Sequence, residues 1–326
     1  MLVFKLALRR LTSSVPTLLV LLATLFVLLQ FAPGDTVDAL TAQMGGGDGS
    51  SAAELRRIYG LEGSTTLRLA KYMWHLMRLD LGFSAIYNKP VSAVIMERLP
   101  TTLLLMTSSL FFAFFAGTLL GILSAQRVNG ITDTLISSLG LLFYSMPSFW
   151  LGLMSIVVFS IWLAWLPPGG IQEIGSGLTG VALVLDIARH LVQPTITLSL
   201  IFLAVYLRVM RASMLEVSSL DFVRTARAKG LSNGAIVRRH ILRNALLPML
   251  TLVGLQAGTM LGGSVVIESV FSLPGIGRLA YEAVVQRDLN TLLGIVVVSA
   301  GLLIVVNFAV DLIYARLDPR ITIGGH

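Results

Sequence analysis

Six stretches of this 326-residue chain contain no Asp, Glu, Lys or Arg, and their lengths constrain its fold more than any other feature. A helix needs about 20 apolar residues to cross a hydrocarbon core roughly 30 Å thick. Only 13% of the residues are charged, whereas a soluble domain carries about 25%. The sequence therefore predicts an all-α integral membrane protein and excludes an ordinary soluble enzyme. The stretches cover 11–34, 99–126, 134–172, 191–207, 244–267 and 289–310.

Charges and helix breakers at the ends of these stretches define six expected transmembrane helices within a single domain, 1–326. The third stretch is long, and the breakers from Pro167 to Gly170 end its helix near Trp165. The first is too long for a signal core, and Ala32 before Pro33 is a poor cleavage site. The expected helices cover 11–31, 99–126, 134–165, 191–211, 246–268 and 289–312. The connections are an extracytoplasmic segment, 32–98, extracytoplasmic loops, 166–190 and 271–288, and a cytoplasmic loop, 215–245.

The distribution of Lys and Arg predicts the orientation. With the N-terminus inside, the cytoplasmic segments hold 14 of these residues and the short outside loops hold three. This asymmetry is the positive-inside bias of membrane proteins. We therefore expect both termini to be cytoplasmic, and the net charge of +7 reflects topology and gives no reason to expect a nucleic-acid partner.

The cytoplasmic loop before Pro248 predicts two short helices. Ser219 is a candidate cap for the first helix, and Asp221 falls in its first turn, where a negative charge is favourable. Gly230 can adopt the left-handed conformation that ends a helix, and Ser232 can cap the second one. The first helix has an apolar stripe and a basic face, which suits a groove on a partner protein. The stripe comprises Phe222, Val223 and Ala226, and the basic face carries Arg224 and Arg227.

One part of this loop resembles the coupling loop of ABC-importer permeases. It is the run Arg-Thr-Ala-Arg-Ala-Lys-Gly-Leu over 224–231, followed by Pro248. It is most similar to that of the dipeptide, oligopeptide and nickel subfamily, although Arg224 and Thr225 replace the Glu-Ala of the general pattern. The order of the motifs resembles the first, or B-type, permease subunit. Other similar stretches are Ala32–Asp35, Tyr59–Leu61, Asp80–Ser84, Glu97–Leu103, Ser145–Trp150, Phe271–Gly277 and Asp318–Ile321.

This resemblance implies a type I ABC-importer permease fold and a multi-pass location in a bacterial or archaeal cytoplasmic (inner) membrane. It implies a heterodimer with a homologous second permease subunit, two cytoplasmic ATPase subunits and an extracytoplasmic solute-binding protein. ATP and Mg are expected on the ATPases, because this chain has no Gly-x-x-x-x-Gly-Lys-Ser/Thr loop. The implied ATPase-coupling residues are Asp221, Phe222, Val223, Arg224, Thr225, Ala226, Arg227, Gly230 and Leu231.

Polar residues within the spans are candidates for the translocation pathway. We select Ser145, Gln256, Ser264 and Glu268. Packing is the alternative role, because polar groups in a bilayer commonly form hydrogen bonds between helices. Four glycines from Gly254 to Gly263 also favour a close helix interface.

Two other classes of function compete with an ABC importer. A proton-coupled secondary transporter commonly has ionisable residues inside its spans, and the six stretches have none. An intramembrane enzyme needs a nucleophile with a base, or a metal cluster; the chain has no Cys, and its four His are isolated and lie outside the expected spans. We therefore expect no catalytic residue, metal site or bound cofactor. Peptides are the expected cargo, with nickel, glutathione and oligosaccharide as alternatives.

Overall fold

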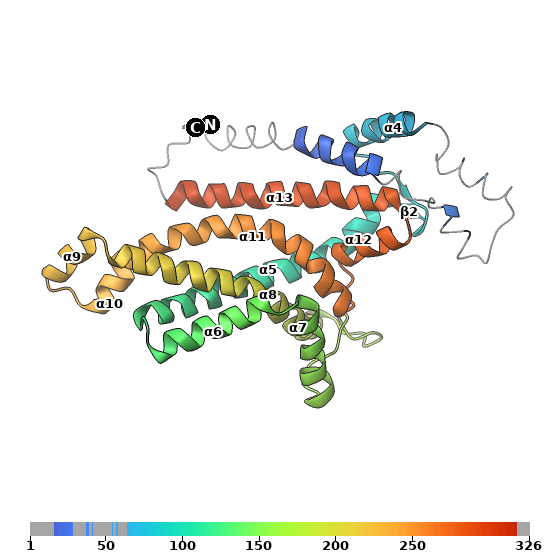
Figure 1. Ribbon diagram of the computed structural model, residues 1–326. Coiled ribbons are helices and arrows are strands. Elements are labelled where there is room, and N and C mark those ends of the chain that lie inside the picture. Colours follow the sequence, from blue (N-terminus) through green and yellow to red (C-terminus); the bar gives the residue numbers. More distant parts are fainter. Residues whose placement is uncertain are drawn as a thin grey trace. The chain divides into compact units, whose positions relative to one another are not determined.

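The computed structural model describes residues 16–28, 37, 38, 41, 54, 57 and 64–317. Contacts divide the chain into two compact units: unit 1 is Met1–Thr102 with Pro274–Phe308, and unit 2 is Leu103–Leu273 with Ala309–His326. Figure 1 shows that the described elements are almost entirely helices. The predicted similarities at 32–35, 59–61 and 318–321 lie outside the described residues.

The helices follow the apolar stretches of the sequence. The labelled elements are α4 (Thr65–Met77), β1 (Phe83–Ser84), β2 (Lys89–Pro90), α5 (Val91–Gln126), α6 (Ile131–Ser145), α7 (Ser148–Ser155), the π-helix η1 (Ile156–Trp162), α8 (Gly180–Ser218), α9 (Asp221–Ala228), α10 (Asn233–Ile236), the π-helix η2 (Val237–Ile241), α11 (Leu242–Val270), α12 (Ile276–Val285) and α13 (Leu289–Leu317). An apolar helix, Pro16–Leu28, precedes them.

Four helical segments in the described part of the chain are long and apolar enough to cross a membrane. They are Val91–Gln126, Gly180–Ser218, Asn233–Val270 and Leu289–Val310. A fifth arises if the bent pair Ile131–Ser145 and Ser148–Trp162 is one span. The first expected span, 11–31, is described only over Pro16–Leu28, so the number six stays a prediction.

The expected single helix over 134–165 is wrong, because the chain bends by 103° between α6 and α7 (Figure 1). Met146 and Pro147 have extended backbones at this break, with ψ angles of 137° and 134°. Proline sterically disfavours the helical conformation of the preceding residue. The Met146-Pro147 step therefore divides the third stretch, although its apolar sequence continues on both sides.

Several helices extend beyond the apolar stretches that predicted them. Helix α5 begins at Val91 and contains Pro100, whereas we expected a start at residue 99. Helix α8 begins at Gly180, inside the expected loop 166–190, and continues to Ser218. At 1.5 Å per residue its 39 residues span about 58 Å, far more than a hydrocarbon core of roughly 30 Å. The absence of charge therefore marks the apolar middle of a helix and not its ends.

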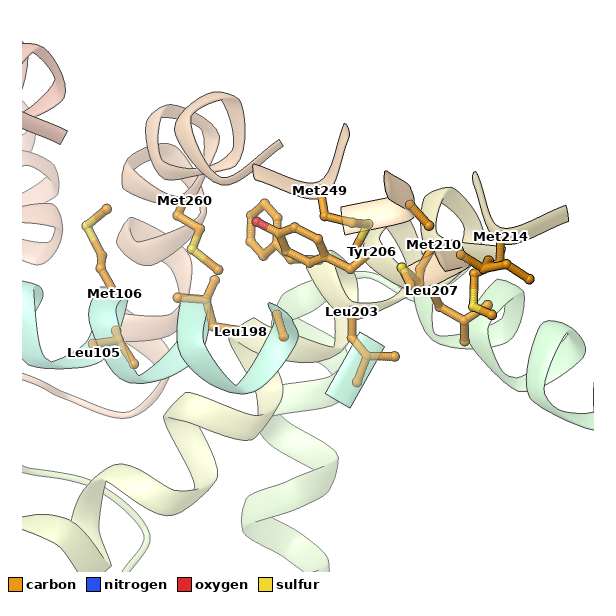
Figure 2. Packing of buried hydrophobic residues seen from close by; sticks show 14 of the residues in the cluster. Leu105, Met106, Leu198, Leu203, Tyr206, Leu207, Met210, Met214, Met249 and Met260 are labelled. Atoms are coloured by element: carbon orange, nitrogen blue, oxygen red, sulfur yellow. The ribbon is translucent and has the colours of Figure 1, made fainter. Parts of the chain in front are cut away.

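The core of unit 2 lies where α5 and α11 pack against α8, as Figure 2 shows for Tyr206 and its methionine neighbours. Gly117 and Gly121 on α5 allow the closest approach to α8. An added Cβ atom would lie 2.6 Å from Cβ of Tyr206 at the first glycine and 2.7 Å from Cβ of Met210 at the second. Small residues four apart allow helix backbones to approach closely in membranes. This pair was missed by the sequence analysis, which singled out the glycines of α11.

Unit 1 contains a short β-hairpin that an all-α prediction did not include. Strands β1 and β2 are antiparallel, with Phe83 opposite Pro90 and Ser84 opposite Lys89. Two apolar clusters lie in the same unit. One includes Val91, Ile95, Ile276 and Leu279, and the other includes Leu22, Phe26, Leu76 and Leu293.

The turn that contains this hairpin is held by a buried polar cluster. Asp288 is only 2% exposed and accepts hydrogen bonds from the hydroxyls of Ser84 and Thr291, the latter at 2.8 Å. Its other oxygen accepts from the backbone N–H of Thr291 at 3.1 Å, which caps the start of α13. The hydroxyl of Tyr87 donates to Glu282 at 2.8 Å. Burial, and then this hydrogen bond, raise the pKa of Tyr87 to about 12.

Candidate functional site

The loop between α8 and α11 folds as two short helices, as predicted, and lies at one end of these two long helices (Figure 1). The first is α9, and Asp221 is in its first turn. Its N-cap residue is Leu220, which has no capping side chain, and not Ser219. The Ser219 hydroxyl instead donates to the carbonyl of Glu216 at 2.7 Å, so it belongs to the end of α8.

Gly230 ends the first helix in the predicted left-handed conformation, with a φ of +78°. The backbone N–H groups of Lys229 and Gly230 donate to the carbonyls of Thr225 and Arg227 at 3.0 and 2.9 Å. The hydroxyl of Ser232 accepts a hydrogen bond from the N–H of Ala235 at 3.4 Å, as expected for a cap of the second helix. This second helix continues through η2 into α11 and past Pro248, so it has no break before the membrane segment.

The apolar stripe of α9 is divided between the interior and the surface. Val223 and Ala226 have exposed fractions of 0% and 4% and belong to the core cluster of unit 2. Our expectation that these two side chains form part of an apolar docking surface therefore needs correction. Residues three apart share a face of a helix, and this face packs on the protein's own core, which also contains Ile236 and Ile241.

The remaining residues of this motif form an exposed surface, which we call the α9 surface. Phe222 and Leu231 are 41% and 39% exposed. Arg224 lies 3.5 Å from the carboxylate of Asp221, and both side chains are largely in solvent. The side chains of Arg227 and Lys229 make no hydrogen bond or ion pair with any residue that the structure describes. The α9 surface therefore combines two apolar side chains with basic groups, with Thr225 also exposed.

Three of the four predicted pathway residues lie on one face of α11. Gln256 and Ser264 are 8% and 0% exposed, and Glu268 in the last turn is 0% exposed. Their spacing of eight and four residues places them on the same side of the helix, toward the interior of unit 2. The fourth, Ser145, is exposed at the end of α6 and donates to the carbonyl of Leu141 at 2.9 Å. A role of these residues in the pathway stays a prediction.

Hydrogen bonds account for two of the pathway candidates on α11. The side-chain oxygen of Gln256 accepts from the Thr259 hydroxyl at 3.3 Å, and Ser264 donates to the carbonyl of Leu261 at 2.9 Å. These bonds are local to one helix. They satisfy buried polar groups that lack water.

An ion pair that sequence analysis missed joins the first turn of α6 to α8. Arg211 donates to both carboxylate oxygens of Asp133 at 2.8 Å. Asp133 also accepts from the hydroxyl of Ser124 and, at 2.9 Å, from the backbone N–H of Asn129. In the sequence analysis Arg211 was counted only as a topology signal, and Asp133 only as the end of an uncharged stretch. Their 78-residue separation leaves no local pattern that predicts the pair.

One histidine lies elsewhere than we expected. We expected all four histidines outside the spans, but His190 lies inside α8, a helix long and apolar enough to cross a membrane, and is 7% exposed. It was assigned to a loop because α8 extends 11 residues further than its charge-free stretch indicated. Within the described residues, no group of three or more His, Asp or Glu could hold a metal ion.

These features define a membrane permease subunit, and comparison with known proteins identifies its family. Residues 117–323 match the family described as the binding-protein-dependent transport system inner membrane component. The chain belongs to this family. It is a multi-pass subunit of a transporter and not a catalytic enzyme.

Relatives match almost the whole chain. A putative peptide permease protein of Brucella ovis is 39% identical over 97% of this chain and 98% of its own length. The di/tripeptide transport system permease protein DppB of Pseudomonas aeruginosa is 37% identical over 96% of this chain and 97% of its own. The oligopeptide transport system permease protein AppB of Bacillus subtilis is 36% identical over 96% of this chain and 98% of its own.

A solved structure supports the fold independently. A chain of the MetNI methionine ABC transporter, in an inward-facing conformation, has a TM-score of 0.55 with this protein. The match covers 70% of this chain and 97% of that chain at 19% identity. At this identity the likeness concerns the fold alone, and it agrees with the predicted ABC-importer permease architecture.

Proposed function

We propose that this chain is the membrane subunit of an ATP-driven importer of di- or oligopeptides. The peptide cargo is supported by the relatives above, whose names describe peptide, di/tripeptide and oligopeptide permeases. In this proposal a solute-binding protein delivers the cargo, and the chain forms half of the translocation pathway with a homologous permease subunit. Two ATPase subunits, which bind ATP and Mg, drive the cycle.

The α9 surface is the observation that supports ATPase coupling. Its exposed Phe222 and Leu231 offer an apolar contact to a groove on the ATPase. Arg224 and Arg227 offer charged hydrogen bonds to the rim of that groove. Exposed apolar side chains surrounded by polar ones are typical of protein interaction sites. Val223 and Ala226 pack in a core that also includes residues of α8 and α11, and in this proposal a movement of α9 therefore moves these two helices.

The proposal includes the orientation and the surroundings of the chain. The α9 surface faces the cytoplasm, both termini are cytoplasmic, and six spans cross a bacterial or archaeal inner membrane. The bias of Lys and Arg supports this orientation, and eight of the 24 basic residues lie between Arg208 and Arg243. The residues proposed to contact the ATPase are Asp221, Phe222, Arg224, Thr225, Arg227 and Leu231, and those proposed to hold α9 in position are Val223, Ala226 and Gly230.

A charge reversal at Arg227 tests the coupling role. We expect Arg227→Glu to reduce copurification of the ATPase subunits and peptide uptake by roughly tenfold, the ratio that corresponds to about 1.4 kcal/mol of lost binding. The matched control is Arg243→Glu, which reverses another exposed arginine outside the α9 surface. Equal loss in both variants, or no loss in either, would refute the assignment. Peptide uptake that persists when the ATPases carry an inactive phosphate loop would refute the ATP-driven mechanism itself.

A further inference from the structure

A cavity of about 320 Å³ lies within unit 2, beside the first turns of α8. Its volume is at the small end of the range for ligand sites, roughly 300–1,000 Å³. Residues from η1, the following loop and α8 line it, and the charged ones are Glu173, Asp186, Arg189 and His190. The cavity therefore brings ionisable side chains together, and none of its lining residues belongs to the α9 surface.

A buried histidine and a partly buried aspartate, His190 and Asp186, form one wall of the cavity. His190 is 7% exposed, and its Nδ1 atom lies 2.9 Å from the carbonyl oxygen of Asp186 and 3.3 Å from the carboxylate oxygen Oδ1 of the same residue. A carbonyl oxygen can accept a hydrogen bond but cannot donate one, and the same is true of Oδ1 in an ionised carboxylate. Nδ1 must therefore carry the hydrogen, and this assignment follows from its partners. In the neutral ring, Nε2 is then an acceptor with a free lone pair.

The other groups of the cavity are mainly acceptors as well. The second carboxylate oxygen of Asp186 accepts from the backbone N–H of Glu173 at 2.8 Å. Neither the carboxylate of Glu173 nor Nε2 of His190 has a hydrogen-bond partner among the described residues. The cation Arg189 donates from its guanidinium to the carbonyl of Trp165 at 2.8 Å, and not to either carboxylate of the cavity.

We propose that this cavity binds an aliphatic ammonium or guanidinium group. An alkylammonium has up to three N–H donors and no acceptor, which matches the two carboxylates and the imidazole lone pair. Hydrogen bonds between a cation and a carboxylate are stronger than neutral ones. Two lining residues, Ser160 and Pro167, are held by the amide of Gln193, which donates to the Ser160 hydroxyl at 2.7 Å and to the carbonyl of Pro167 at 2.9 Å.

Two natural sources supply such a group, and naming them rests on the proposed function. One is a Lys or Arg side chain of the solute-binding protein, because the loop 166–190 is predicted to face the same compartment as that protein. The other is the amino terminus of a peptide cargo. The chemistry of recognition is the same in both cases, so the experiment must separate the sources.

The probe is ethylammonium chloride, added to the full chain with its partner subunits in nanodiscs. The nanodiscs contain phosphatidylcholine and phosphatidylglycerol, which carry no ammonium N–H. We expect the ¹³Cε1 resonance of His190, in protein labelled at histidine and assigned with His190→Gln, to shift on titration with ethylammonium but not with equal NaCl. Glu173→Gln should weaken this response severalfold. The matched control Glu216→Gln, which changes an exposed glutamate at the other end of α8, should not.

Further additions identify the source. A shift on adding the cargo-free solute-binding protein assigns the ligand to that protein. A shift with a free peptide, but not with the same peptide acetylated at its amino terminus, assigns it to the cargo. No ethylammonium response, or one that Glu173→Gln leaves unchanged, overturns the proposal. So does a response to ethylammonium with neither natural source, which would make this an adventitious cation site. The ethylammonium titration does not depend on transport, so its failure would leave the ATP-driven uptake experiments unaffected.

Discussion

The α9 surface and the turn from Asp80 to Pro90 are both short polar connections, and they use their polar groups in opposite ways. In the turn, Ser84 and its partner Asp288 are buried, and the hydrogen bonds close within unit 1. On the α9 surface, Arg227 and Lys229 are exposed and have no partner among the described residues. Internally bonded groups hold a fold together, whereas exposed groups remain available to another molecule. This contrast is the physical basis for the function we propose.

The largest expected effect distinguishes the carboxylates of the two regions. Asp288→Ala leaves two hydroxyls and the N–H of Thr291 without their acceptor in a buried site, which should lower the free energy of unfolding by about 1–3 kcal/mol. Asp221→Ala removes an exposed carboxylate and should change it by about 0.5 kcal/mol or less. Thermal unfolding of both variants in nanodiscs measures this difference. Equal losses of unfolding free energy in Asp288→Ala and Asp221→Ala would contradict the distinction between a buried structural carboxylate and an exposed one.

Adjacent residues of α9 sharpen the comparison within one helix. Val223→Ala creates a cavity in the core and should cost about 1–3 kcal/mol of unfolding free energy. Phe222→Ala removes an exposed ring and should leave stability nearly unchanged while it reduces copurification of the ATPases. Thermal unfolding and copurification are measured on the same two preparations. A destabilised Phe222→Ala with normal copurification would reverse our assignment of the two side chains.

A smaller, pH-dependent effect is expected from Tyr87 in the turn. Tyr87→Phe removes the hydrogen bond to Glu282 and should cost about 1 kcal/mol at neutral pH. Burial and this hydrogen bond raise the pKa of Tyr87 from 10.0 to about 12, so the folded state favours the protonated phenol. Its contribution to stability is complete below pH 10 and is lost as the pH rises toward 12.

The unfolding temperature of the wild type should therefore approach that of Tyr87→Phe across this pH interval. A difference between the two proteins that stays constant from pH 8 to about 12 would contradict this account. The turn contains a second shifted group, Asp80, whose pKa is lowered by the backbone N–H of Gly82 and by His75. Since that carboxyl group titrates only under acidic conditions, it does not affect this interval.

Local patterns in the sequence were sufficient for the membrane class and for the α9 loop. Gly230 and Ser232 act within one or two turns of chain, so their left-handed end and cap follow from neighbouring residues. The break at Pro147 was also encoded locally, but we treated the uninterrupted apolar run as one helix. Pro147 favours an extended backbone at Met146, and this preference ends the helix although apolar residues continue on both sides.

The features that sequence analysis missed depend on packing between distant segments. Burial of Val223 requires knowledge of which face of α9 meets the core, and an amphipathic pattern alone does not distinguish that core from a partner. The pairing of Asp133 with Arg211 and the approach of α8 to Gly117 connect elements that are far apart in the chain. The cavity at His190 forms because α8 starts earlier than the apolar stretch predicted.

The most direct test of the proposed coupling role uses the absence of cysteine from the chain. Single variants Phe222→Cys and Val223→Cys are treated with a membrane-impermeant maleimide, once as the purified chain and once as the fraction of the chain that is recovered bound to its ATPase subunits. We expect Cys labelling at position 222 to be rapid in the isolated chain and strongly protected in the complex, and labelling at position 223 to be slow in both. Equal labelling at position 222 in the isolated chain and in the complex would contradict the assignment of the α9 surface to ATPase docking.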